Sequence, residues 1–394
     1  MERLKRGNLR VDEINKSKKK KTKRLMIVVG LIALLIGSVI IITRLQNIRF
    51  NAFEVSNSAE LSNLTGSKFT SYRGGIIKAN RDGAEAISSE GKQIWNVPYN
   101  MKDPLVDVNK SYAVIGDLGG KSAYIVNGSG VVNAINTLHP IVEVQVAAQG
   151  VAAIVLNNGD KDLINIYSME QTNELVYVES VAAKDGFPIS IALSEDGKKL
   201  ITSYVKADAE SITCQVTFHN FGNVGKNYGD LLVGSQSFAE FVPKVEFITN
   251  NVASVFLENG FWMYSMEEKP VELAKVVFDQ RIQDIFYGDS YVGIVLEPQG
   301  TTQASRLVMY NIEGVNIVDR EINFSYDSIA SGEDYVVFYN DESCHVIKTN
   351  GKDEFEDNFS LIINHLLPGP SFNKFLAITD IGMDTIEMIE TKEE

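Results

Sequence analysis

Cysteine, histidine and proline are scarce in this chain, and their scarcity excludes several classes of protein. The 394 residues include two Cys, four His and nine Pro. Cys214 and Cys344 stand far apart, with no CxxC pair and no Cys/His cluster, which excludes a disulfide framework and disfavours a structural zinc site. We expect both thiols to be buried and unpaired, which is the common state of a free cysteine.

Motifs for catalysis, cofactor binding or metal binding are also missing. No serine stands in a GxSxG elbow, and no two histidines have HxH or HxxxH spacing. Gly116–Ser122 resembles a phosphate-binding loop, but Ile115 stands where that motif needs Gly, and a strand pattern follows where it needs a helix. Asn157–Asp162 contains several side-chain oxygens that could bind calcium, but they lack the spacing of an EF-hand calcium loop. We predict turns at both places, and no catalytic residue, cofactor or metal.

Positive charge is confined to the N-terminus. Residues 1–24 hold eleven Lys or Arg against three acids, a net charge of +8, so the rest of this −14 chain carries −22. A surface that acidic repels nucleic acid, which we exclude as a partner of the main body.

A single long apolar run follows the basic tail. Residues 25–43 (LMIVVGLIALLIGSVIIIT) are nineteen residues without a charge. As a helix they would span roughly 28 Å, close to the thickness of the hydrocarbon core of a bilayer. No small-x-small cleavage site follows, so we predict an uncleaved signal anchor and not a signal peptide. The positive-inside rule then places residues 1–24 in the cytoplasm and the bulk of the chain outside the cell membrane.

Beyond a linker at 44–66, a short apolar segment recurs eight times at an average spacing of about 43 residues, the period of a four-stranded propeller blade. Both faces of each segment are apolar, as expected for a strand packed between two sheets. We take these segments as the leading, innermost strands of the blades. In chain order they are GIIKAN (75–80), YAVIGD (112–117), VAAIVL (151–156), LITSYV (200–205), VASVFL (252–257), YVGIVL (291–296), YVVFYN (335–340) and FLAITD (375–380).

The spacing predicts an all-β fold in which residues 67–394 form an eight-bladed β-propeller after one transmembrane helix. The last repeat lacks an outer strand, and residues 49–55 can supply it, which would close the ring and remove an exposed edge. Seven blades is the alternative, if the 75–100 unit and the C-terminal strands share one blade.

Two segments resemble known propeller repeats. Residues 86–95 (AISSEGKQIW) resemble the repeat of quinoprotein-like (PQQ-type) propellers, and residues 191–200 (IALSEDGKKL) resemble that of WD40-like and TolB-like propellers. The whole layout is similar to an uncharacterised family of membrane-anchored propellers from clostridia and related Firmicutes. The resemblance implies a fold and a compartment but no activity.

One long stretch between repeats, residues 220–240, is the candidate contact loop for a partner, because loop insertions in propellers project from a rim. The alternative is that its apolar residues cap one blade against the next. The candidate residues are Phe221, Tyr228, Leu231, Leu232 and Phe238.

Three functions remain open at this stage. The first is a non-catalytic binding or scaffold module for an envelope protein, peptide or glycan, held in the lipid bilayer by residues 25–43. The second is a ligand sensor that signals through a partner chain, since only 24 residues would lie inside the cell. The third is a cell-envelope enzyme, which would require carboxylates or histidines from different blades to meet at the propeller axis.

Overall fold

The computed structural model describes residues 30, 31, 37, 50–159, 161–171, 173–181, 185–207, 212–300, 304–359 and 362–390. The chain divides into two compact units, Met1–Phe50 with Glu390–Glu394, and Asn51–Ile389. Apart from Gly30, Leu31 and Gly37, which are helical, the predicted membrane segment at 25–43 lies outside the described residues. Within the described residues, no helix is both long enough and apolar enough to cross a membrane.

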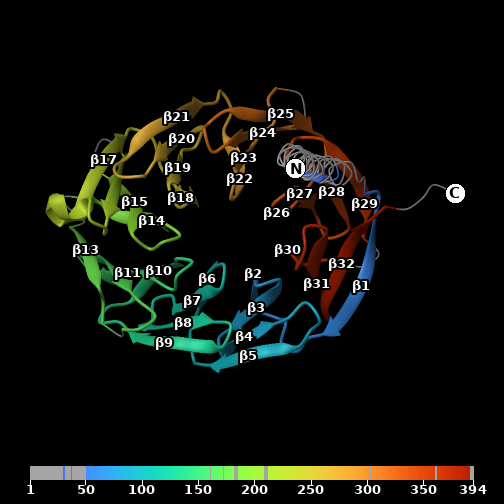
Figure 1. Ribbon diagram of the computed structural model, residues 1–394, viewed down its shortest axis with the longest axis horizontal. Coiled ribbons are helices and arrows are strands. Elements are labelled where there is room, and N and C mark those ends of the chain that lie inside the picture. Colours follow the sequence, from blue (N-terminus) through green and yellow to red (C-terminus); the bar gives the residue numbers. More distant parts are fainter. Residues whose placement is uncertain are drawn as a thin grey trace, which may run out of the picture. The chain divides into compact units, whose positions relative to one another are not determined.

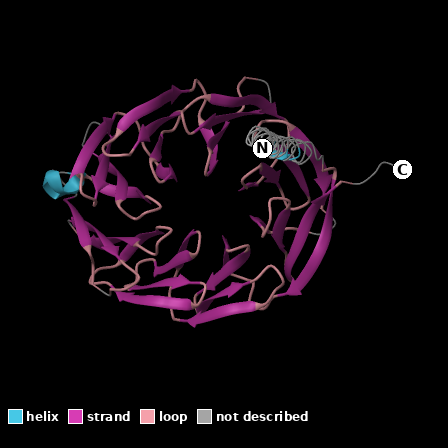
Figure 2. Ribbon diagram, in the orientation of Figure 1, coloured by secondary structure: helices cyan, strands magenta, loops and turns pink. Residues whose placement is uncertain are grey.

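The second unit is a ring of eight four-stranded antiparallel sheets, which confirms the predicted eight-bladed β-propeller (Figure 1). Figure 2 shows that strands make up nearly all of its regular structure. The first four blades are β2 (Lys68–Tyr72), β3 (Gly75–Asn80), β4 (Gly83–Ile87), β5 (Gln93–Pro98); β6 (Pro104–Asn109), β7 (Tyr112–Asp117), β8 (Ser122–Asn127), β9 (Gly130–Asn136); β10 (Ile141–Val146), β11 (Ala152–Asn158), β12 (Lys161–Tyr167), β13 (Val176–Val181); and β14 (Phe187–Leu193), β15 (Lys199–Ala207), β16 (Ile212–Asn220), β17 (Leu232–Phe238).

Blade 4 also carries two short 3₁₀ helices, η1 (Gly225–Asn227) and η2 (Gly229–Leu231), between β16 and β17. The last four blades are β18 (Lys244–Thr249), β19 (Val252–Phe256), β20 (Gly260–Ser265), β21 (Val271–Val277); β22 (Ile282–Gly288), β23 (Tyr291–Leu296), β24 (Ser305–Asn311), β25 (Asn316–Ile322); β26 (Ser328–Ser331), β27 (Tyr335–Tyr339), β28 (Ser343–Lys348), β29 (Asp353–Asn358); and β30 (His365–Pro368), β31 (Lys374–Ile378), β32 (Gly382–Ile389), β1 (Ala52–Glu60).

The eight recurring apolar segments are the second strands of the blades, so their assignment as innermost strands was wrong. In each sheet another strand precedes them, and this preceding strand lies nearest the axis. The second strands stand out in the sequence because they are the most buried. In β23, for example, all six positions are buried because sheets cover both of its faces. In the inner strand β22 only Phe286 of the seven residues is buried, so its hydrophobic pattern is weaker.

The N-terminal strand β1 closes the ring by pairing with β32. Their antiparallel register runs from Ala52 opposite Ile389 to Glu60 opposite Gly382. The outer strand expected at 49–55 is therefore present, although it begins at Ala52 and continues to Glu60. A strand from one end of the domain completes a sheet from the other end, which removes the free edge of blade 8.

The core lies between neighbouring blades, where apolar faces of the sheets meet. Trp262 of blade 5 packs edge-on against Phe238 of blade 4, with ring centroids 4.8 Å apart. Trp95 is buried beside Tyr72 and belongs to the cluster between blades 1 and 2. Cys214 and Cys344 are both buried and free, as expected from their isolation in sequence.

Candidate functional site

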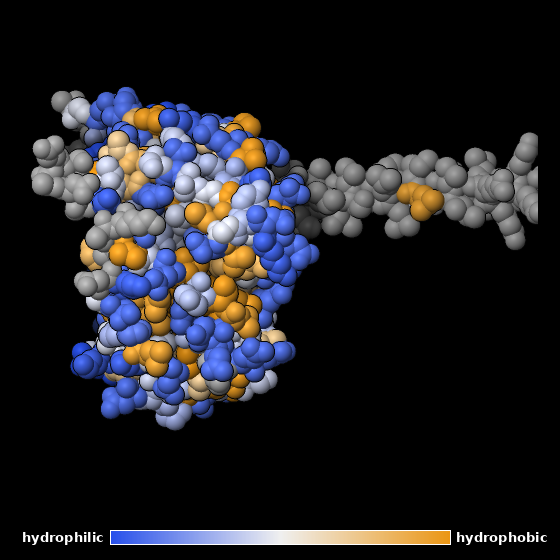
Figure 3. Space-filling model, turned by 90° about the vertical axis from the view of Figure 1, so that its left-hand side faces the viewer, coloured by the Kyte–Doolittle hydropathy of each residue, from blue (hydrophilic) through white to orange (hydrophobic). Residues whose placement is uncertain are grey.

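Four of the five candidate contact residues lie in or next to the segment with η1 and η2, and Phe238 lies at the other end of β17. This part of blade 4 is on the side of the propeller that faces the viewer in Figure 3. Leu231 and Leu232 line one cavity of about 600 Å³. Phe238 is only 5% exposed and packs on Trp262, while Tyr228 holds the Lys269 ammonium 4.7 Å above its ring. Phe221 packs against the core cluster of blades 3 and 4. The structure therefore brings two of the five together and sets Tyr228 and Phe238 against blade 5.

The propeller has two faces that differ in their loops. We call one the crossover face: it carries the loops that pass from the outer strand of one blade to the inner strand of the next, and the turns between second and third strands. The opposite face carries the remaining hairpin turns. Since β1 ends at the crossover face, its first residue, Ala52, lies at the opposite face, where the chain enters the propeller.

The loops of the crossover face carry more exposed apolar side chains than the loops of the opposite face. Among the described residues, five such side chains lie in the crossover loops and three in the loops of the opposite face. Leu138 and Ile381 are the most exposed, at 82% and 76%. Exposed hydrophobic groups in the loops of one face make that face the candidate surface for interaction. The five in the crossover loops are Leu118, Leu138, Phe241, Ile362 and Ile381.

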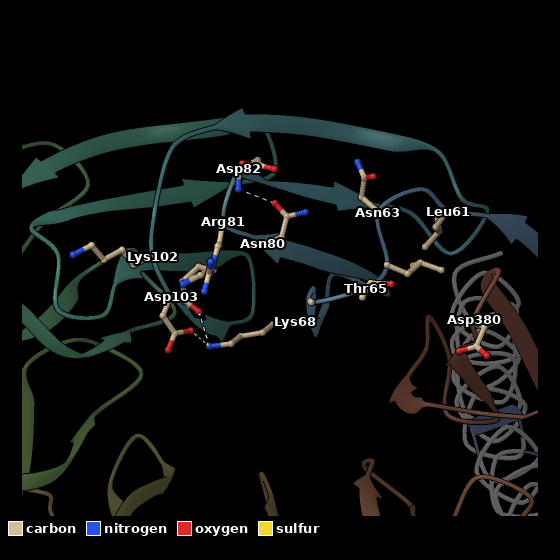
Figure 4. A pocket seen from close by; sticks show the side chains of 13 residues that line it. Leu61, Asn63, Thr65, Lys68, Asn80, Arg81, Asp82, Lys102, Asp103 and Asp380 are labelled. Carbon is tan, nitrogen blue, oxygen red and sulfur yellow. Dashed lines mark hydrogen bonds and ion pairs between the residues drawn. The ribbon is translucent and has the colours of Figure 1, made fainter.

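The crossover face also has a charged cavity of about 880 Å³ over blades 8, 1 and 2 (Figure 4). Lys68 reaches across it to Asp103, with 2.6 Å between Nζ and Oδ1. Arg81 and Lys102 are exposed at its wall, and no described residue forms an ion pair with either. The cavity therefore offers two cationic groups to an acidic or polar group of a partner.

Ionisable side chains from four blades converge at the propeller axis. Lys244 Nζ lies 3.0 Å from Glu246 Oε2, and the Tyr287 hydroxyl donates to the same oxygen at 2.6 Å. Asp107 and Glu143 lie close enough for their charges to act on Lys244. These five residues come from β6, β10, β18 and β22, and we call them the axial cluster.

Burial controls the protonation of the axial cluster. It raises the pKa of Asp107 to about 6 and that of Glu143 to about 7, although each carboxylate accepts a backbone N–H bond that favours its charged form. Burial also raises the pKa of Tyr287, helped by Glu246. Burial lowers the pKa of Lys244, but Glu246 and the other carboxylates outweigh this and raise it. The two carboxyl groups can therefore gain and lose protons near neutral pH.

The axial carboxylates join neighbouring blades. Val146 N donates to Asp107 Oδ2 at 2.7 Å, which links blades 3 and 2. Ile191 N donates to Glu143 Oε1 at 3.4 Å, which links blades 4 and 3. Ser190 Oγ makes the equivalent link between blades 4 and 5 by accepting a hydrogen bond from Val245 N. Inner strands of separate blades do not share a sheet, so these side chains provide polar contacts between them around the axis.

Neither a histidine cluster nor a metal site is found in the described part of the chain, where no three His, Cys, Asp or Glu are arranged to hold an ion. Gly116–Ser122 spans the hairpin turn between β7 and β8, and Asn157 and Asp162 face each other where β11 meets β12. Both loop-like motifs in the sequence are therefore turns between strands, as predicted.

Sequence reasoning missed the axial cluster. A weak signal was present, because Asp107, Glu143, Glu246 and Asp284 each precede a recurring apolar segment by five to eight residues. That regularity places an acid on the inner strand of four of the eight repeats. Only the closure of the ring shows that these strands face one another.

Comparisons with known proteins place the fold. The chain is similar to BamB from Moraxella catarrhalis, with a TM-score of 0.52 and 11% identity over 86% of this chain and 100% of that one. It is also similar to apo AztD from Citrobacter koseri, with a TM-score of 0.51 and 9% identity over 75% and 87% of the two chains. At such identities these likenesses show the propeller fold alone.

No curated protein matches this sequence. One family model does match, over residues 46–388, which is nearly the whole propeller and well over half of the chain. The protein therefore belongs to the family of unknown function DUF5711.

Proposed function

We propose that this protein is a membrane-anchored, extracytoplasmic module that binds an envelope protein or peptide on its crossover face without catalysing a reaction. The observation that carries the proposal is the set of exposed apolar side chains on that face, beside the cavity with Arg81 and Lys102. Apolar anchors with a charged rim are the usual composition of a protein-binding surface.

The N-terminal sequence supports the proposed membrane anchoring. The basic residues 1–24 and the apolar residues 25–43 favour an anchor with its N-terminus in the cytoplasm. The resemblance to membrane-anchored propellers of Firmicutes agrees with this arrangement.

Site-specific photo-crosslinking in living cells tests the proposal. A photoreactive residue at Leu138 or Ile381 should capture one defined partner, because both side chains project from the crossover face. Matched controls are Leu175 and Val315, which are also exposed but belong to the loops of the opposite face. Equal capture from both faces, or none from the crossover face, would contradict the proposal.

An enzyme with an axial site is a second candidate function. The convergence of Asp107, Glu143 and Glu246 favours it, since two of these carboxyl groups have pKa values near neutrality, as general acids and bases require. Their bonds to neighbouring blades give the same residues a structural task. Turnover of a cell-wall fragment that Glu143→Gln abolishes would place this candidate first.

A further inference from the structure

A second cavity, of about 600 Å³, opens on the circumference of the propeller between blades 3 and 4. The outer strand β13 forms one wall, and β16 with the start of β17 forms the other. This side faces the viewer in Figure 3, where hydrophilic and hydrophobic groups are interspersed. Its volume is within the range of small-molecule binding sites, and it lies away from the axis.

The floor of this cavity holds a buried histidine without a partner. His219 is 4% exposed, and its buried Nδ1 makes no hydrogen bond to any described residue. Burial lowers the pKa of His219 to about 4, so the ring is neutral at pH 7 and offers one donor and one acceptor. Tyr204, 3% exposed, adds a hydroxyl that stays protonated. A buried polar atom left without a bond is costly, and a bound ligand would supply the missing partner.

The lining of the cavity is acidic. It includes Glu179, Asp185 and Asp230, and no Lys or Arg occurs among its described lining residues. Glu179 is paired with Lys161, and Asp185 accepts from the backbone N–H of Val181, so both carboxylates are held in place. Asp230 is exposed and makes no ion pair in the described part of the chain. A ligand with a positive charge would be attracted to this cavity.

The residues over the mouth have an unusual backbone. Asp230 and the next residue, Leu231, have φ values of +55° and +59°, a left-handed conformation that non-glycine residues rarely adopt. Such strain is found most often at binding sites and other functional positions. Here it sets the Asp230 carboxylate and the Leu231 side chain at the same opening, opposite Tyr177 on β13.

We propose that this cavity binds a small ligand that carries both hydroxyl groups and an ammonium group, as an amino sugar does. A hydroxyl donates and accepts at once, so it satisfies the neutral His219 ring, and the ammonium group pairs with Asp230 at the mouth. Tyr177, Leu231 and Leu232 cover the apolar face of the ligand. The proposal is independent of the crossover face and its partner.

Isothermal titration of the full chain, purified in a mild detergent, tests the proposal with three probes: glucosamine, glucose and N-acetylglucosamine. Glucosamine should bind with one site per chain, and the two uncharged sugars should bind at least about tenfold more weakly, because they lack the ammonium group. A short glucosamine oligomer distinguishes a free amino sugar from a polymer of amino sugars as the natural ligand. Tighter binding of the oligomer indicates a polymer as the natural ligand, and equal binding indicates the free sugar.

Asp230→Asn should weaken glucosamine binding about tenfold while leaving glucose binding unchanged, and His219→Phe should weaken all probes. Asp327→Asn, an exposed acid on blade 7, is the matched control and should bind as the wild type does. Because Asp230 is exposed, its variant remains informative if His219→Phe fails to fold. The proposal is overturned if glucosamine shows no saturable binding, or if Asp230→Asn binds it as tightly as the wild type.

Discussion

Glu143 and Asp107 show how tertiary surroundings distinguish a few acids from the 51 in this chain. In the sequence they are ordinary members of alternating strands. In the folded ring they stand at the axis beside Glu246, Lys244 and Tyr287, where little water is left to stabilise their charges. Their protonation therefore reports whether the ring is closed.

The raised pKa of Glu143 has a consequence for stability. The folded chain keeps a proton on Glu143 up to about pH 7, whereas the unfolded chain loses it near the ordinary value of 4.5. The contribution of Glu143 to the free energy of unfolding is therefore fully present below about pH 4.5, falls as pH rises to about 7, and stays constant above that.

Glu143→Gln should remove this loss of stability with rising pH, because Gln is neutral at every pH, as the protonated acid is. The variant should also keep the bond from Ile191 N, because the Gln amide oxygen accepts. At pH 8 the variant should be more stable than the wild type, by on the order of 2 kcal/mol. Below pH 4 the two should be equal. Urea unfolding across this pH range measures the difference, with the exposed Glu321→Gln as the control that changes little. A wild-type advantage at pH 8 would contradict the assigned protonation.

At the scale of the strands, the hydrophobic pattern identified each blade but led to the wrong assignment of its innermost strand. The second strands are apolar on both faces, so they stand out in the sequence, whereas an inner strand such as β22 has a single buried residue. β26 and β30 have only four residues each. A strand whose one side faces the axis needs fewer apolar residues, so its signal in the sequence is weak.

Ring closure makes the C-terminal strands essential to the fold. Deleting residues 375–394 removes most of β31 and all of β32, so β1 and β30 lose their hydrogen-bonded partners. We expect this truncated chain to lose cooperative thermal unfolding and to be digested rapidly by protease. Deleting only residues 391–394, which follow β32, is the control and should preserve both properties. A stable, cooperative product of the longer deletion would show that closure is dispensable.

At the scale of the whole molecule, the two buried cysteines make the proposed topology testable. Because Cys214 and Cys344 are buried, a membrane-impermeant maleimide should label the wild type weakly. Leu138→Cys should be labelled strongly in intact protoplasts, and Lys18→Cys only after lysis, since residues 1–24 are proposed to lie in the cytoplasm. The reverse pattern would invert the topology.

The sequence by itself determined the all-β class, the eight repeats, the closing strand and the absence of a recognisable catalytic motif. These features are local or periodic. A strand buried on both faces needs a continuous run of apolar residues, and such a run is visible in the sequence. Only the tertiary structure decided which residues meet. Asp107 and Glu246 come from different blades, and His219 of blade 4 lines the same cavity as Glu179 of blade 3. Contacts between separate blades depend on how sheets pack around the axis, and no short stretch of sequence records that geometry.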